Sequence, residues 1–264
     1  MQTLPPPDAA RALTLGPEAL LEGCRAEVAR SRSAAAALRA TAAPRPLEAT
    51  LSAFDAVFSP LAEASSRASL ARSVHPDEAV RQAAEQAEQE VAALATEFSL
   101  DRGLYEVLAS LDPAGAGEVS RFFLEKSLRD FRRAGVDRDD ATRAAIQALQ
   151  EELVRIGQAF GRNIKDDRRT LRLDPEALDG LPEDWRRAHQ AGADGLCEVS
   201  TDPADYLPFM TYAKSEQARA ALWTLSRQRA HPANLEVLAA LLARRSELAG
   251  LLGWPSWAAF ASAV

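Results

Sequence analysis

The sequence predicts a mainly α-helical protein built from antiparallel helix hairpins, with a small two-stranded β element near residues 168–200. Two observations support this prediction. Apolar residues recur every three or four positions along most of the chain, which is the period of a half-buried helix. Only between about residues 168 and 200 do they alternate, as in a strand that buries one face.

The first two helices form a hairpin near the N-terminus. Pro17 suits the first turn of a helix that extends to about Leu38, and Pro44 and Pro46 interrupt the chain before the second helix. The second helix carries apolar residues at alternating steps of four and three, namely Leu47, Leu51, Phe54, Phe58 and Leu61.

A long helix begins after the segment His75-Pro76-Asp77-Glu78. Its inner face comprises Val80, Ala84, Ala87, Val91, Leu94 and Phe98. A short helix around Leu104 and Leu108 follows and ends at Asp112-Pro113. The next helix carries Phe122, Phe123, Leu128 and Phe131.

The most regular helix of the chain follows Gly135. Asp137, Asp139 and Asp140 precede it, where their charges complement the positive end of a helix. Its apolar residues are spaced three and four apart, namely Ile146, Leu149, Leu153, Ile156 and Phe160. After it, Thr170–Leu173 and Leu196–Val199 alternate like strands, and Leu178–Pro182 predicts a turn into a short helix.

The stretch from Asp205 to Val264 predicts two amphipathic helices and the start of a third. Ser215 suits the N-cap of the first helix, and Asn234 suits the N-cap of the second. The second helix ends at Gly253 and carries a leucine stripe made of Leu235, Leu238, Leu241, Leu242, Leu248, Leu251 and Leu252.

These elements suggest three segments. Residues 1–72 form the N-terminal helical hairpin, residues 73–200 form a helical region with the small β insertion, and residues 201–264 begin a second lobe. A chain of 264 residues is long enough to bury a substantial core.

Composition argues against proteins that bind nucleic acid or that associate with membranes. The chain is 47% hydrophobic and 26% charged, with a formal net charge of -7, so it is a poor match to a protein that binds nucleic acid or an anionic membrane. No apolar run approaches the ~20 residues of a membrane span, and no signal peptide is recognisable, so we expect a cytoplasmic protein. Cys24 and Cys197 are expected to be reduced thiols, one on a helix face and one in a strand.

Several motifs resemble the thimet oligopeptidase family, which includes neurolysin, oligopeptidase A and mitochondrial intermediate peptidase. They are the order Tyr206, Pro208, Met210, then Ser215, Glu216, Arg219, then Asn234 and the segment Leu251–Ala258. The Phe160–Asn163 and Leu178–Pro182 segments also match. The resemblance implies a helical zinc metallopeptidase that cuts short peptides in a deep channel, with the zinc site in its C-terminal half.

The zinc site of that family is missing from this sequence. It needs two histidines one helical turn apart with a glutamate beside the first, and none of His75, His189 and His231 has such a partner. We interpret His75 and His231 as helix-entry residues and His189 as a surface residue. The sequence also lacks a Gly-x-Ser-x-Gly elbow and a phosphate-binding glycine loop. No catalytic or metal-binding residue is therefore assigned, and no substrate-binding residue can be named.

Two groups of side chains have both a structural and a functional interpretation. The basic cluster, Arg162, Lys165, Arg168, Arg169 and Arg172, is favoured as a helix C-terminal cap with a solvated loop. Its alternative is a patch for a carboxylate of a peptide or of a partner domain. The aromatic side chains are favoured as core rather than ligand contacts, and they are Tyr206, Phe209, Tyr212, Trp223, Trp254 and Trp257.

These observations lead to one favoured function and two alternatives. The favoured one is the non-catalytic N-terminal half of a zinc oligopeptidase, a channel wall that needs a C-terminal half carrying the zinc. The first alternative is a helical binding or regulatory protein derived from that family, and the second, an enzyme of another chemistry, lacks a motif to support it. Because the chain ends soon after Trp254, Trp257 and Phe260, we also expect these aromatics to lack cover. The expected consequence is self-association or contact with a separately encoded catalytic half.

Overall fold

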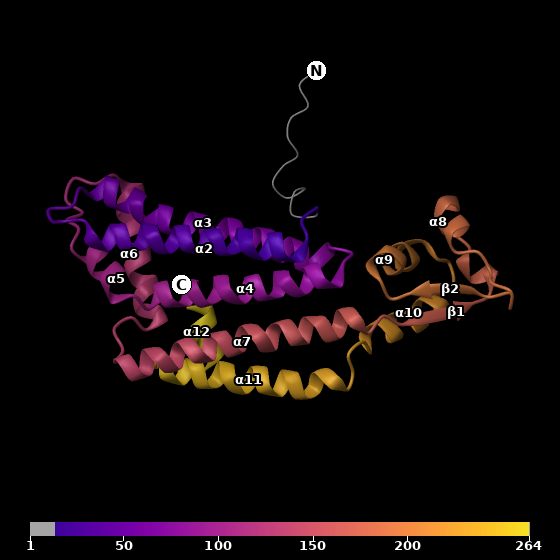
Figure 1. Ribbon diagram of the computed structural model, residues 1–264. Coiled ribbons are helices and arrows are strands. Elements are labelled where there is room, and N and C mark those ends of the chain that lie inside the picture. The colour runs from indigo at the N-terminus through magenta and orange to yellow at the C-terminus, as the bar shows by residue number, and fades with distance from the viewer. Residues whose placement is uncertain (1–13, 264) are drawn as a thin grey trace, which may run out of the picture. The chain divides into compact units, whose positions relative to one another are not determined.

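Residues 14–263 are described by a computed structural model, and they confirm the predicted fold class (Figure 1). The described part is 73% helical and contains eleven α-helices and one two-stranded antiparallel sheet. The chain divides into two compact units, unit 1 (Met1–Arg155 with Ala243–Val264) and unit 2 (Ile156–Leu242). The segment boundaries expected at residues 72 and 200 stay predictions.

Three long helices form the body of unit 1: α2 (Pro17–Ala40), α3 (Leu47–Val74) and α4 (Glu78–Ser99). The predicted hairpin is confirmed as α2 and α3, and α4 packs against both (Figure 1). Ala64 and Ala68 of α3 are fully buried, and such small side chains allow helix axes to approach closely. The Asp77 side chain caps α4 by accepting a hydrogen bond of 2.8 Å from the Ala79 N–H.

The core of unit 1 is closed by α5 (Arg102–Ala109) and α6 (Glu118–Ala134). Both helices contribute residues that are almost inaccessible to solvent, including Leu104, Leu108, Leu124 and Phe131. Cys24 is one of two buried free cysteines, as expected, and burial raises the pKa of its thiol. Phe122 of α6 lies outside this core, with 64% of its surface exposed.

A second cluster of unit 1 joins α7 (Asp140–Asp166) to α11 (Ala233–Leu251) and α12 (Trp257–Ser262). Its buried members are Leu100, Ile146, Leu149, Leu248 and Leu252. The predicted leucine stripe of α11 is thus buried only toward its C-terminal end. Leu235, Leu238 and Leu242, spaced so that they share one face of α11, are 57%, 39% and 56% exposed, which corrects the expectation of a continuous buried stripe.

Unit 2 contains the small sheet. The strands β1 (Thr170–Leu173) and β2 (Cys197–Ser200) pair antiparallel, with Thr170 opposite Ser200 and Leu173 opposite Cys197, as the alternation predicted. Around the sheet lie the 3-10 helix η1 (Pro175–Leu178) and the helices α8 (Glu183–Ala188), α9 (Pro203–Tyr212) and α10 (Glu216–Arg227). The core of unit 2 comprises Leu178, Leu181, Cys197, Val199, Phe209, Ala213, Ala218 and Leu222.

Helix α9 was not expected from the sequence, which predicted only α10, α11 and α12 in this stretch. Pro208 lies inside α9, and proline removes one N–H donor from a helix. The helix persists because Phe209 is completely buried in the core of unit 2. Ser215 caps the following helix α10 as predicted, accepting a hydrogen bond of 3.2 Å from the Ala218 N–H.

Gly180 allows the turn after η1 to approach the end of α9. It has a φ of +94°, and a Cβ at this position would lie 2.3 Å from the carbonyl oxygen of Tyr212. The adjacent Asp179 carbonyl accepts a hydrogen bond of 2.9 Å from the Lys214 N–H. The Asp179 carboxylate accepts another of 3.0 Å from the Lys214 ammonium group, which holds the pKa of Asp179 below its usual range.

Candidate functional site

The three histidines do not form a metal site in the described part of the chain. His75 lies at the C-terminal end of α3, and its Nδ1 accepts a hydrogen bond of 3.1 Å from the Asp77 N–H. His231 is exposed between α10 and α11. Within residues 14–263 no group of three or more histidine, cysteine or acidic side chains is placed to hold a metal ion.

The interpretation of His189 as a surface residue is wrong, because its side chain is partly buried and held by other residues. Its side chain is 15% exposed and stacks on Trp185, with ring centroids 3.7 Å apart. Its Nδ1 lies 2.8 Å from the Trp185 carbonyl oxygen, and its Nε2 lies 3.0 Å from an oxygen of Asp205. The polar sequence around α8 gave no signal of this contact, which Asp205 of α9 supplies from another element.

Asp205 joins His189 to Ser200 in a small polar network of unit 2. The same carboxylate accepts a hydrogen bond of 3.0 Å from the Ser200 N–H and a further, short one from the Ser200 hydroxyl. A hydrolytic triad requires the histidine to lie between the serine and the acid, whereas here the acid lies between the other two. The network therefore fastens α9 to β2 and α8 and provides no activated nucleophile.

The protonation of Asp205 should affect the stability of unit 2. Burial raises the pKa of this carboxyl, but the hydrogen bonds from Ser200 and His189 outweigh it and lower the pKa overall. An acid whose pKa is lowered by folding stabilises the fold above its ordinary pKa of about 4 and loses that contribution as the pH falls through the lowered value.

We therefore expect Asp205→Asn to be less stable than the wild type near neutral pH and to approach it in acid. Urea unfolding at a series of pH values measures the difference. Asp184→Asn, on the exposed face of α8, removes the same charge and serves as the control. A constant difference between Asp205→Asn and the wild type across the acid range would contradict the assignment.

Three of the five side chains of the basic cluster pair with acids within unit 2, which favours its structural interpretation. Arg168 pairs with Asp202 at 2.6 Å, Arg169 pairs with Asp167 at 2.8 Å, and Arg172 pairs with Asp194. Arg162 and Lys165 also make interactions in the structure. Because its charges already have partners, the cluster does not present a free patch for a carboxylate.

Asn163 and Asn234, which both belong to the segments resembling the oligopeptidase family, meet in unit 2. The Asn163 side chain donates a hydrogen bond of 2.9 Å to the Asn234 side chain, which donates one of 3.1 Å to the carbonyl oxygen of Phe160. Asn234 lies inside α11, which begins at Ala233. Its predicted role as N-cap is therefore wrong, because its amide is used to join α11 to α7.

The aromatic side chains divide into buried and exposed sets. Phe209 is fully buried, and Tyr206 packs against the same core of unit 2. Tyr212 and Trp223 are 53% and 48% exposed, so the core interpretation is wrong for these two. In unit 1, Trp254 and Trp257 are partly buried and pack against the cluster around Ile146.

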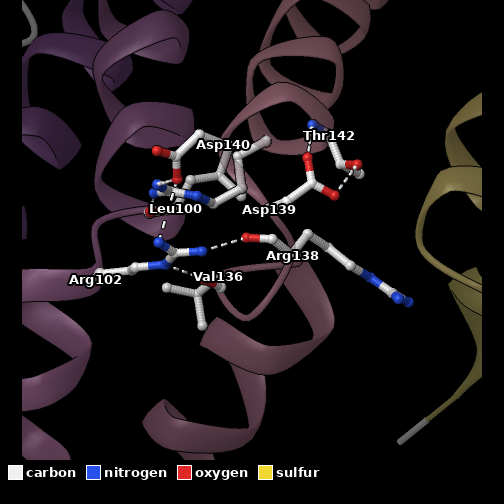
Figure 2. Close-up of polar contacts among 8 residues, drawn as sticks. Leu100, Arg102, Val136, Arg138, Asp139, Asp140 and Thr142 are labelled. Carbon is white, nitrogen blue, oxygen red and sulfur yellow. Dashed lines mark hydrogen bonds and ion pairs between the residues drawn. The ribbon is translucent and has the colours of Figure 1, made fainter.

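The loop between α6 and α7 in unit 1 is a dense polar network (Figure 2). The Arg102 guanidinium donates hydrogen bonds to the Arg138 carbonyl (2.6 Å), the Val136 carbonyl (3.4 Å) and the Asp140 carboxylate (3.2 Å). Arg143 donates to the same carboxylate at 2.7 Å, and this bond lowers the pKa of Asp140.

Asp139, one of the acids predicted to complement the positive end of this helix, caps α7 within the loop. Its carboxylate accepts hydrogen bonds of 2.9 Å and 2.8 Å from the N–H and hydroxyl of Thr142, and these lower the pKa of Asp139 (Figure 2). The Arg138 side chain turns away from the network toward the yellow C-terminal segment (Figure 2), where it donates a hydrogen bond of 2.8 Å to the carbonyl of Leu252.

Beside this loop, unit 1 has an arginine-lined hollow of about 420 Å³. Its lining residues are Arg129, Arg132, Arg133, Leu252, Gly253 and Trp254. The three arginines lie at positions i, i+3 and i+4 of α6, which places them on one helix face. This spacing was visible in the sequence, but the approach of the Leu252–Trp254 turn from α11 was not.

Together these features define a multi-helical protein with a small antiparallel sheet, and no helix among the described residues is long and apolar enough to cross a membrane. The chain is 26% identical over 142 residues to saccharolysin of Saccharomyces cerevisiae and 27% identical over 210 residues to mitochondrial intermediate peptidase 2 of Cryptococcus neoformans var. neoformans serotype D. It is 22% identical over 195 residues to the thimet-like oligopeptidase of Dictyostelium discoideum. These relatives represent the thimet oligopeptidase family, which confirms the resemblance seen in the sequence.

The chain corresponds to only part of the length of these relatives. The three alignments cover 52%, 72% and 70% of this chain but only 20%, 24% and 29% of the respective relatives. The chain thus spans less than a third of the length of these relatives. No protein-family model matches the chain.

Proposed function

We propose that this chain is a non-catalytic helical part of a zinc-dependent oligopeptidase of the thimet type and forms a wall of a channel for short peptides. The zinc site is then supplied by polypeptide outside these 264 residues. One observation supports this most: the chain is similar to peptidases over as much as 74% of its length, yet its sequence has no His-Glu-x-x-His.

The residues that carry the family resemblance support a structural role. Asn163 and Asn234 join α7 to α11, Ser215 caps α10, and Gly180 permits the close approach of α9. Each of these residues stabilises unit 2 and none belongs to a nucleophile–base pair. These framework roles support the proposal of a wall rather than a catalytic centre.

The purified chain alone should bind no stoichiometric zinc and should leave a quenched fluorescent peptide intact, because two histidines at one-turn spacing are missing. Metal analysis after dialysis and a fluorescence assay with and without chelator test this. About one tightly bound zinc per chain together with chelator-sensitive hydrolysis would contradict the proposal.

A second activity assay adds a polypeptide from the same genome that carries His-Glu-x-x-His and a downstream glutamate. Cleavage that needs both chains supports the proposal. Peptide binding by this chain that no such polypeptide converts into cleavage would favour the helical binding protein instead.

The exposed leucines of α11 are the surface proposed to contact the catalytic polypeptide or a second copy of the chain. Leu235→Ser, Leu238→Ser and Leu242→Ser together should abolish that association and reduce hydrophobic-dye binding. Each should change the free energy of unfolding by only about 0.5 kcal/mol, because the side chains are exposed. Sedimentation velocity measures the association. Val119→Ser with Phe122→Ser, on the exposed face of α6, is the control, and an equal loss in the control would contradict this choice of surface.

A further inference from the structure

We propose that the arginine-lined hollow of unit 1 binds a carboxylate of a peptide segment, either an acidic side chain or a terminal carboxyl group. The hollow lies between the C-terminal part of α6 and the turn that follows α11. This inference does not depend on the proposed function, and it concerns a different group of residues from the basic cluster predicted near residue 168.

The arginines that line the hollow are only weakly compensated by acids. The lining contains three arginines and no acidic side chain among the described residues. Arg129 makes a long ion pair of 3.9 Å with Asp130, and Asp130 makes a shorter one of 2.6 Å with Lys126. Weakly compensated guanidinium groups on one helix face create a local positive potential in a chain of net charge -7.

Two of the neighbouring arginines have a structural role. Arg133 donates hydrogen bonds of 2.6 Å and 2.7 Å to the carbonyls of Ala263 and Phe260, and its guanidinium lies 5.3 Å from the centre of the Phe260 ring. Arg138 donates to the Leu252 carbonyl at 2.8 Å. Arg133 fixes the C-terminal segment against α6, and Arg138 holds the turn after α11 against the loop between α6 and α7, so both position the turn that borders the hollow.

Arg129 and Arg132 do not hold the C-terminal segment in place. The Arg132 Nε donates a hydrogen bond of 3.1 Å to the Tyr105 hydroxyl, and its guanidinium lies 5.7 Å from the centre of that ring. Tyrosine positions this guanidinium without neutralising it. Arg129 lies one helical turn earlier on the same face, so two guanidinium groups border the hollow with donors available for an added acid.

The shape and chemistry of the hollow favour an organic carboxylate. A guanidinium presents a planar set of donors that matches a carboxylate through two parallel hydrogen bonds. Leu252 and Trp254 add an apolar surface, which suits the aliphatic part of a glutamate or a terminal residue better than a free inorganic ion. The volume of about 420 Å³ accommodates such a group.

The test measures binding of an acetylated triglutamate peptide to the intact chain by calorimetry at low salt. Arg129→Gln with Arg132→Gln should weaken binding at least about tenfold, since charge-assisted hydrogen bonds are lost. Arg186→Gln with Arg187→Gln, on the exposed helix α8, removes the same charge and should bind like the wild type. Circular dichroism verifies that both variants fold.

Three results of the peptide-binding experiment would overturn the proposal. They are absence of wild-type binding at millimolar peptide, an equal loss in the α8 control, and binding of triglutamine as tight as that of triglutamate. A separate titration with inorganic phosphate distinguishes the ligand class. Phosphate binding that depends on Arg129 and Arg132, without peptide binding, would also overturn it and assign the hollow to phosphate.

Discussion

Gly180→Ala should destabilise unit 2 by about 2–5 kcal/mol, combining the strain of an alanine at positive φ with the cost of overpacking. The added Cβ would lie 2.3 Å from the Tyr212 carbonyl oxygen, which is backbone and cannot rotate away. Relief requires that the end of α9 move from the turn, and Leu178, Leu181 and Ala213 lose their packing as it does so. Urea unfolding and hydrogen exchange within residues 156–242 measure the loss.

The substitution Gly195→Ala separates the backbone strain at positive φ from the overpacking by the added Cβ. Gly195 also has a positive φ, of +80°, but a Cβ there would meet no atom within 4 Å. Its substitution should therefore cost only the conformational strain of about 1–2 kcal/mol. Equal losses in the two variants would show that the close approach of α9 to Gly180 is not what requires glycine.

The triple variant Trp254→Ser, Trp257→Ser and Phe260→Ser should destabilise unit 1 by more than about 4 kcal/mol, since it removes three partly buried aromatics together and truncating a single buried one costs about 3–5 kcal/mol. The Phe260 ring lies 5.3 Å from the Trp257 ring and 6.1 Å from the Trp254 ring, and all three pack against the cluster around Ile146. Arg133 and Arg245 lie over Phe260 and Trp257 at 5.3 Å and 5.2 Å. The expectation that these aromatics lack cover is thus wrong.

The α11 serine triple variant is the matched comparison. Its leucines are exposed, so it should lower association without a comparable loss of stability, whereas the aromatic variant should lose stability. Denaturant unfolding and sedimentation of both variants decide between them. An aromatic variant that remains stable but no longer associates would show that the C-terminal aromatics form the interaction surface.

Most helices could be predicted because burial leaves a period in the sequence. Val80, Leu94 and Phe98 of α4 are almost inaccessible to solvent, at the positions that the spacing indicated. Helix α9 could not be found in this way, because Phe209 is the sole fully buried residue of its ten and Pro208 interrupts the pattern. The limit is physical, since a short helix with one fully buried side chain has little periodicity.

The candidate sites depend on contacts between residues far apart in sequence, which local patterns do not encode. Asn234 has the local features of an N-cap, but its partner Asn163 lies 71 residues away. The cover on Phe260 comes from Arg133, which lies 127 residues earlier. The three arginines of the hollow could be placed on one helix face from their spacing, but the turn that completes the hollow could not.

The division of the chain has a consequence for the order in which the protein is made. Unit 2 is one continuous segment, Ile156–Leu242, so its core can form from residues that leave the ribosome together. Unit 1 is interrupted by that segment, and its buried Ile146 and Leu149 acquire Leu248 and Leu252 only after the whole of unit 2 has been synthesised. The unit 1 residues that precede unit 2 are therefore synthesised before their unit can be completed, and Ile146 and Leu149 have only earlier partners such as Leu100 until α11 has been made.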